Sequence, residues 1–97
     1  ILVPDQLDAE TARAIGLVNR IAEQPLELAV ALANGIGDMA PVAVRYTKEA
    51  LLKGMDMSLE QGLRLEADLY FLLHTTSDRS IGINALLRKK PPKYEGS

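Results

Sequence analysis

Along most of this chain, apolar residues recur every three or four positions, which is the spacing of one face of an α-helix. The clearest case is the segment 59–73, where leucine, alanine and aromatic residues occupy two sides of the predicted helix. A helix that is apolar on two sides is expected to be buried on both. Glycine, proline and short polar stretches separate the periodic segments. These signals predict five helices, at about 9–15, 25–36, 41–53, 59–73 and 77–89.

Three of the predicted helices follow residues whose side chains can accept hydrogen bonds from the free N–H groups of a first helical turn. Asp8 stands before the first helix, and Ser58 stands before the fourth. Gln61 lies three positions after Ser58, which is the spacing of a capping box. Thr76 or Ser77 is expected to cap the fifth helix. These capping residues support the predicted starts independently of the apolar pattern.

The segment between the first two helices has a different pattern. Gly16 is a typical helix-ending residue. The segment Leu17–Ile21 that follows mixes apolar and polar residues, and it is predicted to form a short strand. A single strand is not stable without a partner, and no partner strand is visible elsewhere in the chain. The predicted fold class is therefore mostly α, with about five helices and one short strand.

Composition narrows the kinds of site that the chain can carry. It has no cysteine, which excludes a disulfide framework, a thiolate nucleophile and a cysteine zinc site. No apolar run approaches the roughly 18–20 residues of a membrane-spanning helix. His74 is the only histidine and could in principle serve as a general base. No nucleophile pattern lies near it, so a partner for the helix dipole or an interface residue is the favoured interpretation. No metal site is predicted.

The charge is distributed unevenly. Residues 1–74 carry a net charge of −5, whereas residues 75–97 carry +3. The positive end is too short and too poor in aromatic residues to suggest a nucleic-acid surface. A local anion site is the better interpretation.

The most specific motif lies in this positive end. A helix beginning Thr76-Ser77-Asp78-Arg79 and containing Gly82 runs into the basic stretch Arg88-Lys89-Lys90-Pro91-Pro92-Lys93-Tyr94. This order resembles the carboxyl end of the enoyl-CoA hydratase/isomerase (crotonase) family. Three earlier segments are similar to that family in the same order, namely Leu7–Ile21, Ala40–Lys48 and Leu59–Glu66.

The resemblance implies an organisation and a chemistry. Residues 1–97 would form a single helical domain, in which 1–24 is the end of the family's core with a linking helix and strand. Residues 25–97 would be the carboxyl-terminal helical oligomerisation region of a trimer or a dimer of trimers. The apolar opening Ile1–Pro4 is expected to be a cut through a longer protein. The family's oxyanion hole and catalytic carboxylates lie upstream of the matching segments, so none of the 13 carboxylates here is assigned a catalytic role.

The resemblance also implies one ligand contact. In some family members a lysine of the carboxyl-terminal helix contacts the phosphates of the adenosine part of coenzyme A, and an apolar residue three positions earlier packs near the adenine. These positions correspond to Lys89 and Leu86. The alternative for Lys89 is a cation that complements the end of a helix. Ile81 stands where the family often has glutamate, and Leu86 stands where phenylalanine is common, which weakens any stacking on adenine.

Two other functions remain open from the sequence. The first is a freestanding helical protein-interaction module with no coenzyme A chemistry. The second keeps the family but changes the reaction on the acyl-CoA thioester, since members include isomerases, dehalogenases, decarboxylases and hydrolases. The parent protein is expected to use an acyl-CoA thioester as its substrate without a further cofactor, in the cytoplasm or the mitochondrial matrix. The chain alone is expected to be inactive and to self-associate, without binding nucleic acid or membrane.

Overall fold

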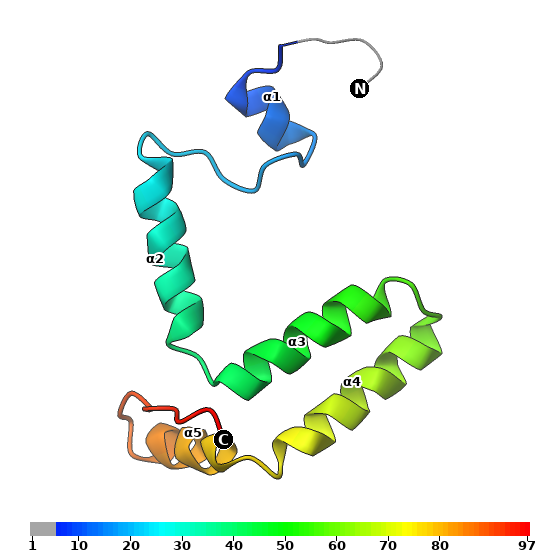
Figure 1. Cartoon of the computed structure of the whole chain (residues 1–97), viewed down its shortest axis with the longest axis vertical. Coiled ribbons are helices and arrows are strands. Elements are labelled where there is room, and N and C mark those ends of the chain that lie inside the picture. Colours follow the sequence, from blue (N-terminus) through cyan, green and yellow to red (C-terminus); the bar gives the residue numbers. More distant parts are fainter. Residues whose placement is uncertain (1–5) are drawn as a thin grey trace. The chain divides into compact units, whose positions relative to one another are not determined.

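The computed structural model describes residues 6–97, and this range contains five α-helices. The predicted helices are confirmed, each with its ends within two residues of the prediction. The opening segment Ile1–Pro4, from which a longer protein was predicted, lies outside the described residues. The helices are α1 (Ala9–Ala14), α2 (Pro25–Gly37), α3 (Pro41–Gly54), α4 (Leu59–Leu73) and α5 (Ser77–Leu87), as Figure 1 shows.

The predicted strand at Leu17–Ile21 is wrong, since residues 6–97 contain no strand. Gly16 adopts a left-handed backbone conformation with φ +77°, and its N–H donates to the carbonyl oxygen of Arg13 at 3.0 Å. The N–H of Leu17 donates to the carbonyl oxygen of Ala12 at 2.8 Å. These two bonds form a Schellman motif. The first residue of the supposed strand therefore completes the end of α1, and no second strand is present to pair with the residues that follow.

The chain divides into two compact units between Ala33 and Asn34, so the division falls within α2. In the first unit, Asp8 caps α1 as predicted, and its side chain accepts a hydrogen bond from the backbone N–H of Thr11 at 2.7 Å. Ala12 is the buried residue of this helix. The predicted division between residues 24 and 25 concerns the roles of the two parts, and it stays a prediction.

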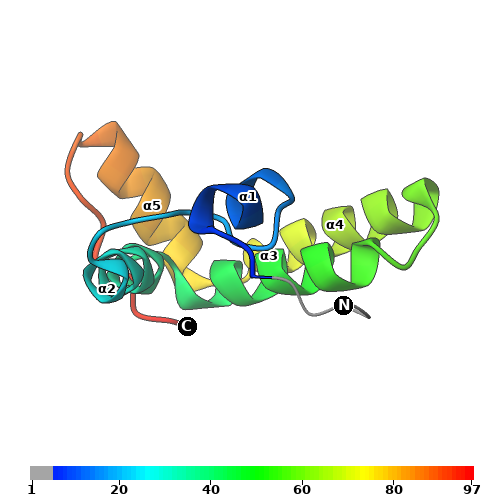
Figure 2. The same cartoon turned by 90° about the horizontal axis from the view of Figure 1, so that it is seen from above.

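In the second unit, the main helix-to-helix contact is between α3 and α4. The two helices run antiparallel and side by side in Figures 1 and 2, joined by the short connection Met55–Ser58. The predicted capping box at the start of α4 is present, with both reciprocal bonds between Ser58 and Gln61. Leu69 is buried, with 8% of its surface exposed. The contact therefore covers one side of α4.

Much of the apolar surface of α4 is open to solvent. Leu59 is 79% exposed and Phe71 is 72% exposed, and Leu63 and Tyr70 are exposed as well. The expectation that this helix is buried on two sides is not met within residues 6–97, where Leu69 is its one buried residue. Soluble monomers rarely expose a large contiguous apolar patch, so these residues are suited to contact with another surface.

In the part of the chain that the structure describes, no single helix is long and apolar enough to cross a membrane. The consecutive helices α2 and α3 reach that length and apolarity only when they are taken together across the bend between them.

Candidate functional site

The candidate anion site is built on α5 and on residues 88–97, which follow this helix and are called the tail. Thr76 provides the N-cap, and its hydroxyl oxygen accepts a hydrogen bond from the backbone N–H of Arg79 at 3.4 Å. The same hydroxyl donates to the carbonyl oxygen of Leu73 at 2.8 Å. One side chain therefore joins the end of α4 to the start of α5 and fixes where the last helix begins.

Helix α5 ends at Leu87, two residues earlier than predicted. Lys89 adopts a left-handed conformation with φ 52°, and its N–H donates to the carbonyl oxygen of Leu86 at 3.1 Å. The N–H of Lys90 donates to the carbonyl oxygen of Ala85 at 3.0 Å. This is a second Schellman motif, with a lysine in the position that glycine usually occupies. The left-handed residue turns the chain out of the helix before the two prolines are reached.

The two residues predicted to contact coenzyme A are therefore neighbours at the turn that ends α5. Leu86 is 78% exposed, and its carbonyl group holds the backbone of Lys89. Lys89 itself lies outside the helix rather than on its last turn, which the sequence pattern did not predict.

We call the exposed cations Arg88, Lys89, Lys90 and Lys93 the basic segment. Within residues 6–97, the one ion pair joins Lys53 to Glu49 on α3, so the basic segment has no carboxylate partner there. Four cations within six residues and without a counter-charge attract anions, with a strength that falls as salt rises.

One buried polar contact in the second unit was not predicted from the sequence. Asp78 is 3% exposed, although it lies in the first turn of a helix and is of a residue type that is usually exposed. Its carboxylate oxygens accept hydrogen bonds from the backbone N–H groups of Glu95 at 2.6 Å and of Gly96 at 2.9 Å. The tail is therefore tied to the beginning of the helix that precedes it.

Two further contacts hold the same tail. The main-chain oxygen of Ser97 accepts hydrogen bonds from the backbone N–H of Ser77 at 2.8 Å and from its hydroxyl at 2.7 Å. Tyr94 lies against Gly82, where an added Cβ would stand 3.3 Å from the phenol oxygen. Figures 1 and 2 show the tail running back along α5 towards its start.

The family-like motif contained Asp78, Gly82 and Tyr94 but not Glu95, Gly96 or Ser97, which complete this arrangement. Nothing in the spacing of the first three showed that they meet in space. The usable signal was the pair of prolines after α5, which prevents the helix from continuing into the tail. Asp78 was predicted only to lie in the favourable first turn of a helix, because that is a local effect.

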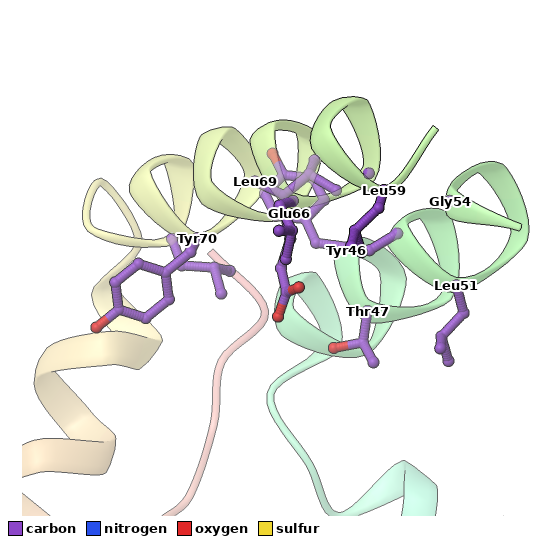
Figure 3. Close-up of a pocket in the computed structure, with 12 residues that line it drawn as sticks. Tyr46, Thr47, Leu51, Gly54, Leu59, Glu66, Leu69 and Tyr70 are labelled. Atoms are coloured by element: carbon purple, nitrogen blue, oxygen red, sulfur yellow. The ribbon is translucent and has the colours of Figure 1, made fainter. Parts of the chain in front are cut away.

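A groove of about 380 Å³ lies between α3 and α4. Figure 3 shows the Glu66 side chain extending from α4 into it, with Thr47 and Leu51 on α3 at the other side. The lining is mostly apolar and includes Leu69 and Tyr70. Its polar side chains are the carboxylate of Glu66 and the hydroxyl groups of Tyr46, Thr47 and Tyr70.

His74 takes the role at a helix end that the sequence favoured. Its Nδ1 lies 3.1 Å from the carbonyl oxygen of Tyr70, and since a carbonyl can only accept, that nitrogen carries the proton in this bond. The ring meets Tyr70 edge-on at 5.0 Å and stacks on Phe71 at 6.0 Å. The His74 ring thus bonds to one of the last carbonyl groups of α4, at the C-cap of this helix. In the described part of the chain, no group of three or more His, Asp or Glu side chains could hold a metal ion.

Comparison with known proteins gives consistent relatives. No protein-family model matches the chain. It is 43% identical over 90 residues to a candidate enoyl-CoA hydratase of Thermus thermophilus, covering 91% of this chain and 36% of that protein. It is 34% identical over 98 residues to the 2,3-dehydroadipyl-CoA hydratase of Escherichia coli, covering 99% of this chain and 38% of that protein. The mitochondrial methylglutaconyl-CoA hydratase of Mus musculus is 36% identical over 96 residues, with 93% and 31% covered.

Solved structures give the same result. An enoyl-CoA hydratase/isomerase from Mycobacterium paratuberculosis matches with a TM-score of 0.89 and 29% identity, covering 96% of this chain and 37% of that one. An enoyl-CoA hydratase from Bacillus anthracis matches with a TM-score of 0.88 and 34% identity, covering 92% and 35%. The chain thus spans a little over a third of the length of most of the relatives it matches.

Proposed function

Because this chain belongs to the enoyl-CoA hydratase/isomerase (crotonase) family and corresponds to its carboxyl-terminal helical part, we propose that it supplies subunit contacts and a coenzyme A contact to an enzyme that acts on acyl-CoA thioesters. The observation that carries the proposal is the match over 91% to 99% of the chain to hydratases of CoA esters. That match also disfavours a freestanding interaction module with no coenzyme A chemistry.

The proposed coenzyme A contact is made by Lys89 and Leu86. A lysine ammonium group suits a phosphate as a mobile point charge, and Lys89 stands in an exposed cluster of cations. Leu86 offers an exposed apolar side chain next to it, against which the adenine can pack. Leucine has no ring to stack, so the lysine contributes most of the attraction in this proposal.

The proposed subunit contacts are made by the exposed apolar residues of α4, namely Leu59, Leu63, Tyr70 and Phe71, of which the first three line the groove against α3. The described part of the chain has no fully buried large side chain, so its helices cover little of their own apolar surface. Assembly into a trimer or a dimer of trimers would remove that surface from water, at about 25 cal/mol for each Å² of apolar area.

The reaction itself is assigned to the rest of the enzyme. In the part of the chain that the structure describes, Asp8, Ser58 and Thr76 cap helices, Asp78 holds the tail and Glu66 lines an apolar groove. We propose that the intact gene product adds water to an enoyl-CoA ester, and that this chain alone is inactive. The relatives include bacterial and mitochondrial proteins, and we propose the cytoplasm as the location, with the mitochondrial matrix as the alternative.

The experiment that tests the contact compares coenzyme A with its 3′-dephospho form in binding to the intact gene product. Lys89→Ala should weaken coenzyme A binding roughly three- to tenfold, as expected for a charge-assisted contact that is partly solvated. Lys48→Ala is the matched control, since Lys48 is an exposed lysine on α3, and it should leave the affinity unchanged. Equal affinities of the wild type and Lys89→Ala would exclude the proposed contact.

A further inference from the structure

Asp78 is a carboxylate with 3% of its surface exposed, and no catalytic role is assigned to it. We infer that Asp78 is a positioning residue: it clamps the tail to the first turn of α5 and thereby holds the basic segment in one orientation. The clamp consists of its two hydrogen bonds to the backbone N–H groups of Glu95 and Gly96. Both acceptors belong to one side chain, so two successive backbone N–H groups of the tail are bonded to the same residue.

The basic segment is held at both ends. At its start, the N–H groups of Lys89 and Lys90 are bonded to carbonyl groups of α5, which fixes the turn. Beyond its other end, Asp78 fixes the backbone at Glu95. The intervening residues include two prolines, whose φ angles are fixed by their rings. Few free dihedral angles are therefore left between the two anchors.

The distance that the tail must cover back along α5 is a large part of what residues Lys89–Glu95 can span. From Asp78 to Arg88 the helix rises about 15 Å at 1.5 Å per residue. The seven residues Lys89–Glu95 can span about 22 Å in an extended polyproline-like conformation. The return path therefore uses more than half of the reach of the segment.

Side chains next to the clamp keep the tail on the helix. Tyr94 occupies the space that the missing side chain of Gly82 leaves open. Gly96 has φ +79° and lies against Pro41, so that an added Cβ would stand 3.4 Å from Cγ of that proline. A residue with a side chain is strained at such a φ, which makes this end of the tail specific for glycine.

Orientation matters here because like charges repel one another. The basic segment brings four cations within six residues, and a free tail would spread them apart. A clamped segment meets a phosphate group with less loss of conformational entropy than a free one, which is the general benefit of preorganisation. This consequence for phosphate binding rests on the proposed coenzyme A contact, whereas the clamp itself does not.

The first test replaces the clamp in the intact gene product. Asp78→Asn leaves one acceptor oxygen and turns an amide N–H towards a backbone N–H, so the peptide 88–97 should exchange its amide hydrogens about tenfold faster. Asp68→Asn makes the same charge change at an exposed position on α4 and should not alter this exchange. Unchanged exchange in Asp78→Asn would overturn the inference.

A second pair of variants keeps the test decisive if Asp78→Asn fails to fold. Glu95→Pro removes the N–H that donates to Asp78, at a position outside every helix. Glu95→Ala removes the same side chain but keeps the N–H. Fast exchange of the tail in the proline variant alone supports the clamp, and equal exchange in both variants overturns it.

The positioning role is read from kinetics with two substrates, an enoyl-CoA and the matching enoyl-pantetheine, which lacks the nucleotide. Asp78→Asn should raise KM for the CoA ester about three- to tenfold with kcat retained, and leave KM for the pantetheine ester unchanged. A general loss of structure would affect both substrates. If the tail loosens while KM for the CoA ester stays constant, and Lys89→Ala raises it, the positioning role is overturned and the proposed function stands. If Lys89→Ala has no effect either, the proposed contact fails, and the exchange experiment alone decides the clamp.

Discussion

The contact between Gly82 and Tyr94 allows a prediction in which two opposing terms are of similar size. Gly82 lies inside α5, and replacing a glycine by alanine in a helix interior stabilises the helix by about 0.8–1.0 kcal/mol. The added Cβ would stand 3.3 Å from the phenol oxygen of Tyr94 and 3.5 Å from its Cε1. The first distance is a few tenths of an ångström shorter than an ordinary van der Waals contact, and the second is an ordinary contact.

The size of the penalty depends on how easily the phenol can move. The oxygen is at the far end of a side chain in the tail, so a small shift relieves the overlap. We therefore expect Gly82→Ala to stabilise α5 by about 0.3–0.6 kcal/mol, which is the helix preference minus a partial steric cost. In the Tyr94→Phe background the nearest atom is gone, and the gain should rise to about 0.8–1.0 kcal/mol.

The assay is the free energy of local opening of α5, from hydrogen exchange of its amides in the four members of a double-mutant cycle. A coupling of about 0.3–0.6 kcal/mol that favours the double variant is expected. A gain of the full helix preference from Gly82→Ala alone would show that the phenol does not rest on the glycine. A loss of stability in both backgrounds would show that the neighbouring ring atoms, and not the hydroxyl, set the limit.

Two further predictions concern other parts of the chain. Leu69→Ala should lower the free energy of unfolding by about 2–3 kcal/mol, which is at the lower end of the range for buried leucines because the adjoining groove is already open. Leu59 is 79% exposed, and Leu59→Ala should change the free energy of unfolding by less than about 0.5 kcal/mol. Equal effects of the two variants in urea denaturation would contradict the packing of α4 on α3. The backbone N–H of Thr11, with its side chain, lowers the pKa of Asp8 below the ordinary value of 3.8, so the cap stabilises α1 above that value and this stabilisation is lost as the pH falls through the lowered pKa. The α-helical chemical shifts of residues 9–14 should follow this titration, and a titration unchanged in Asp8→Ala would contradict it.

Local rules predicted the helices well because their signals are themselves local. The side chains of Asp8, Ser58 and Thr76 bond to an N–H three residues on, so spacing along the sequence determines the contact. The same locality explains the wrong strand. The mixed apolar and polar residues of Leu17–Ile21 predict a strand, but in the structure the chain leaves the left-handed Gly16 without any strand pairing.

The clamp on the tail could not be predicted in this way. The partner of Asp78 lies 17 residues further on, and it is a backbone N–H, which carries no sequence signal. The end of α5 was placed two residues late for a related reason, since lysine rarely takes the left-handed conformation that Lys89 adopts. Both features depend on where the tail goes after the prolines.

The hairpin of α3 and α4 has a consequence for the order of folding. Its contacts join helices that are neighbours in the sequence, through a connection of four residues, and structures rich in such contacts form within microseconds to milliseconds. The exposed apolar residues of α4 are therefore in place as soon as the hairpin has formed. Transiently exposed apolar surfaces of this kind are where misassociation begins. Because these residues are also the ones proposed to make subunit contacts, the time before they are covered is the stage at which this protein is most vulnerable to aggregation.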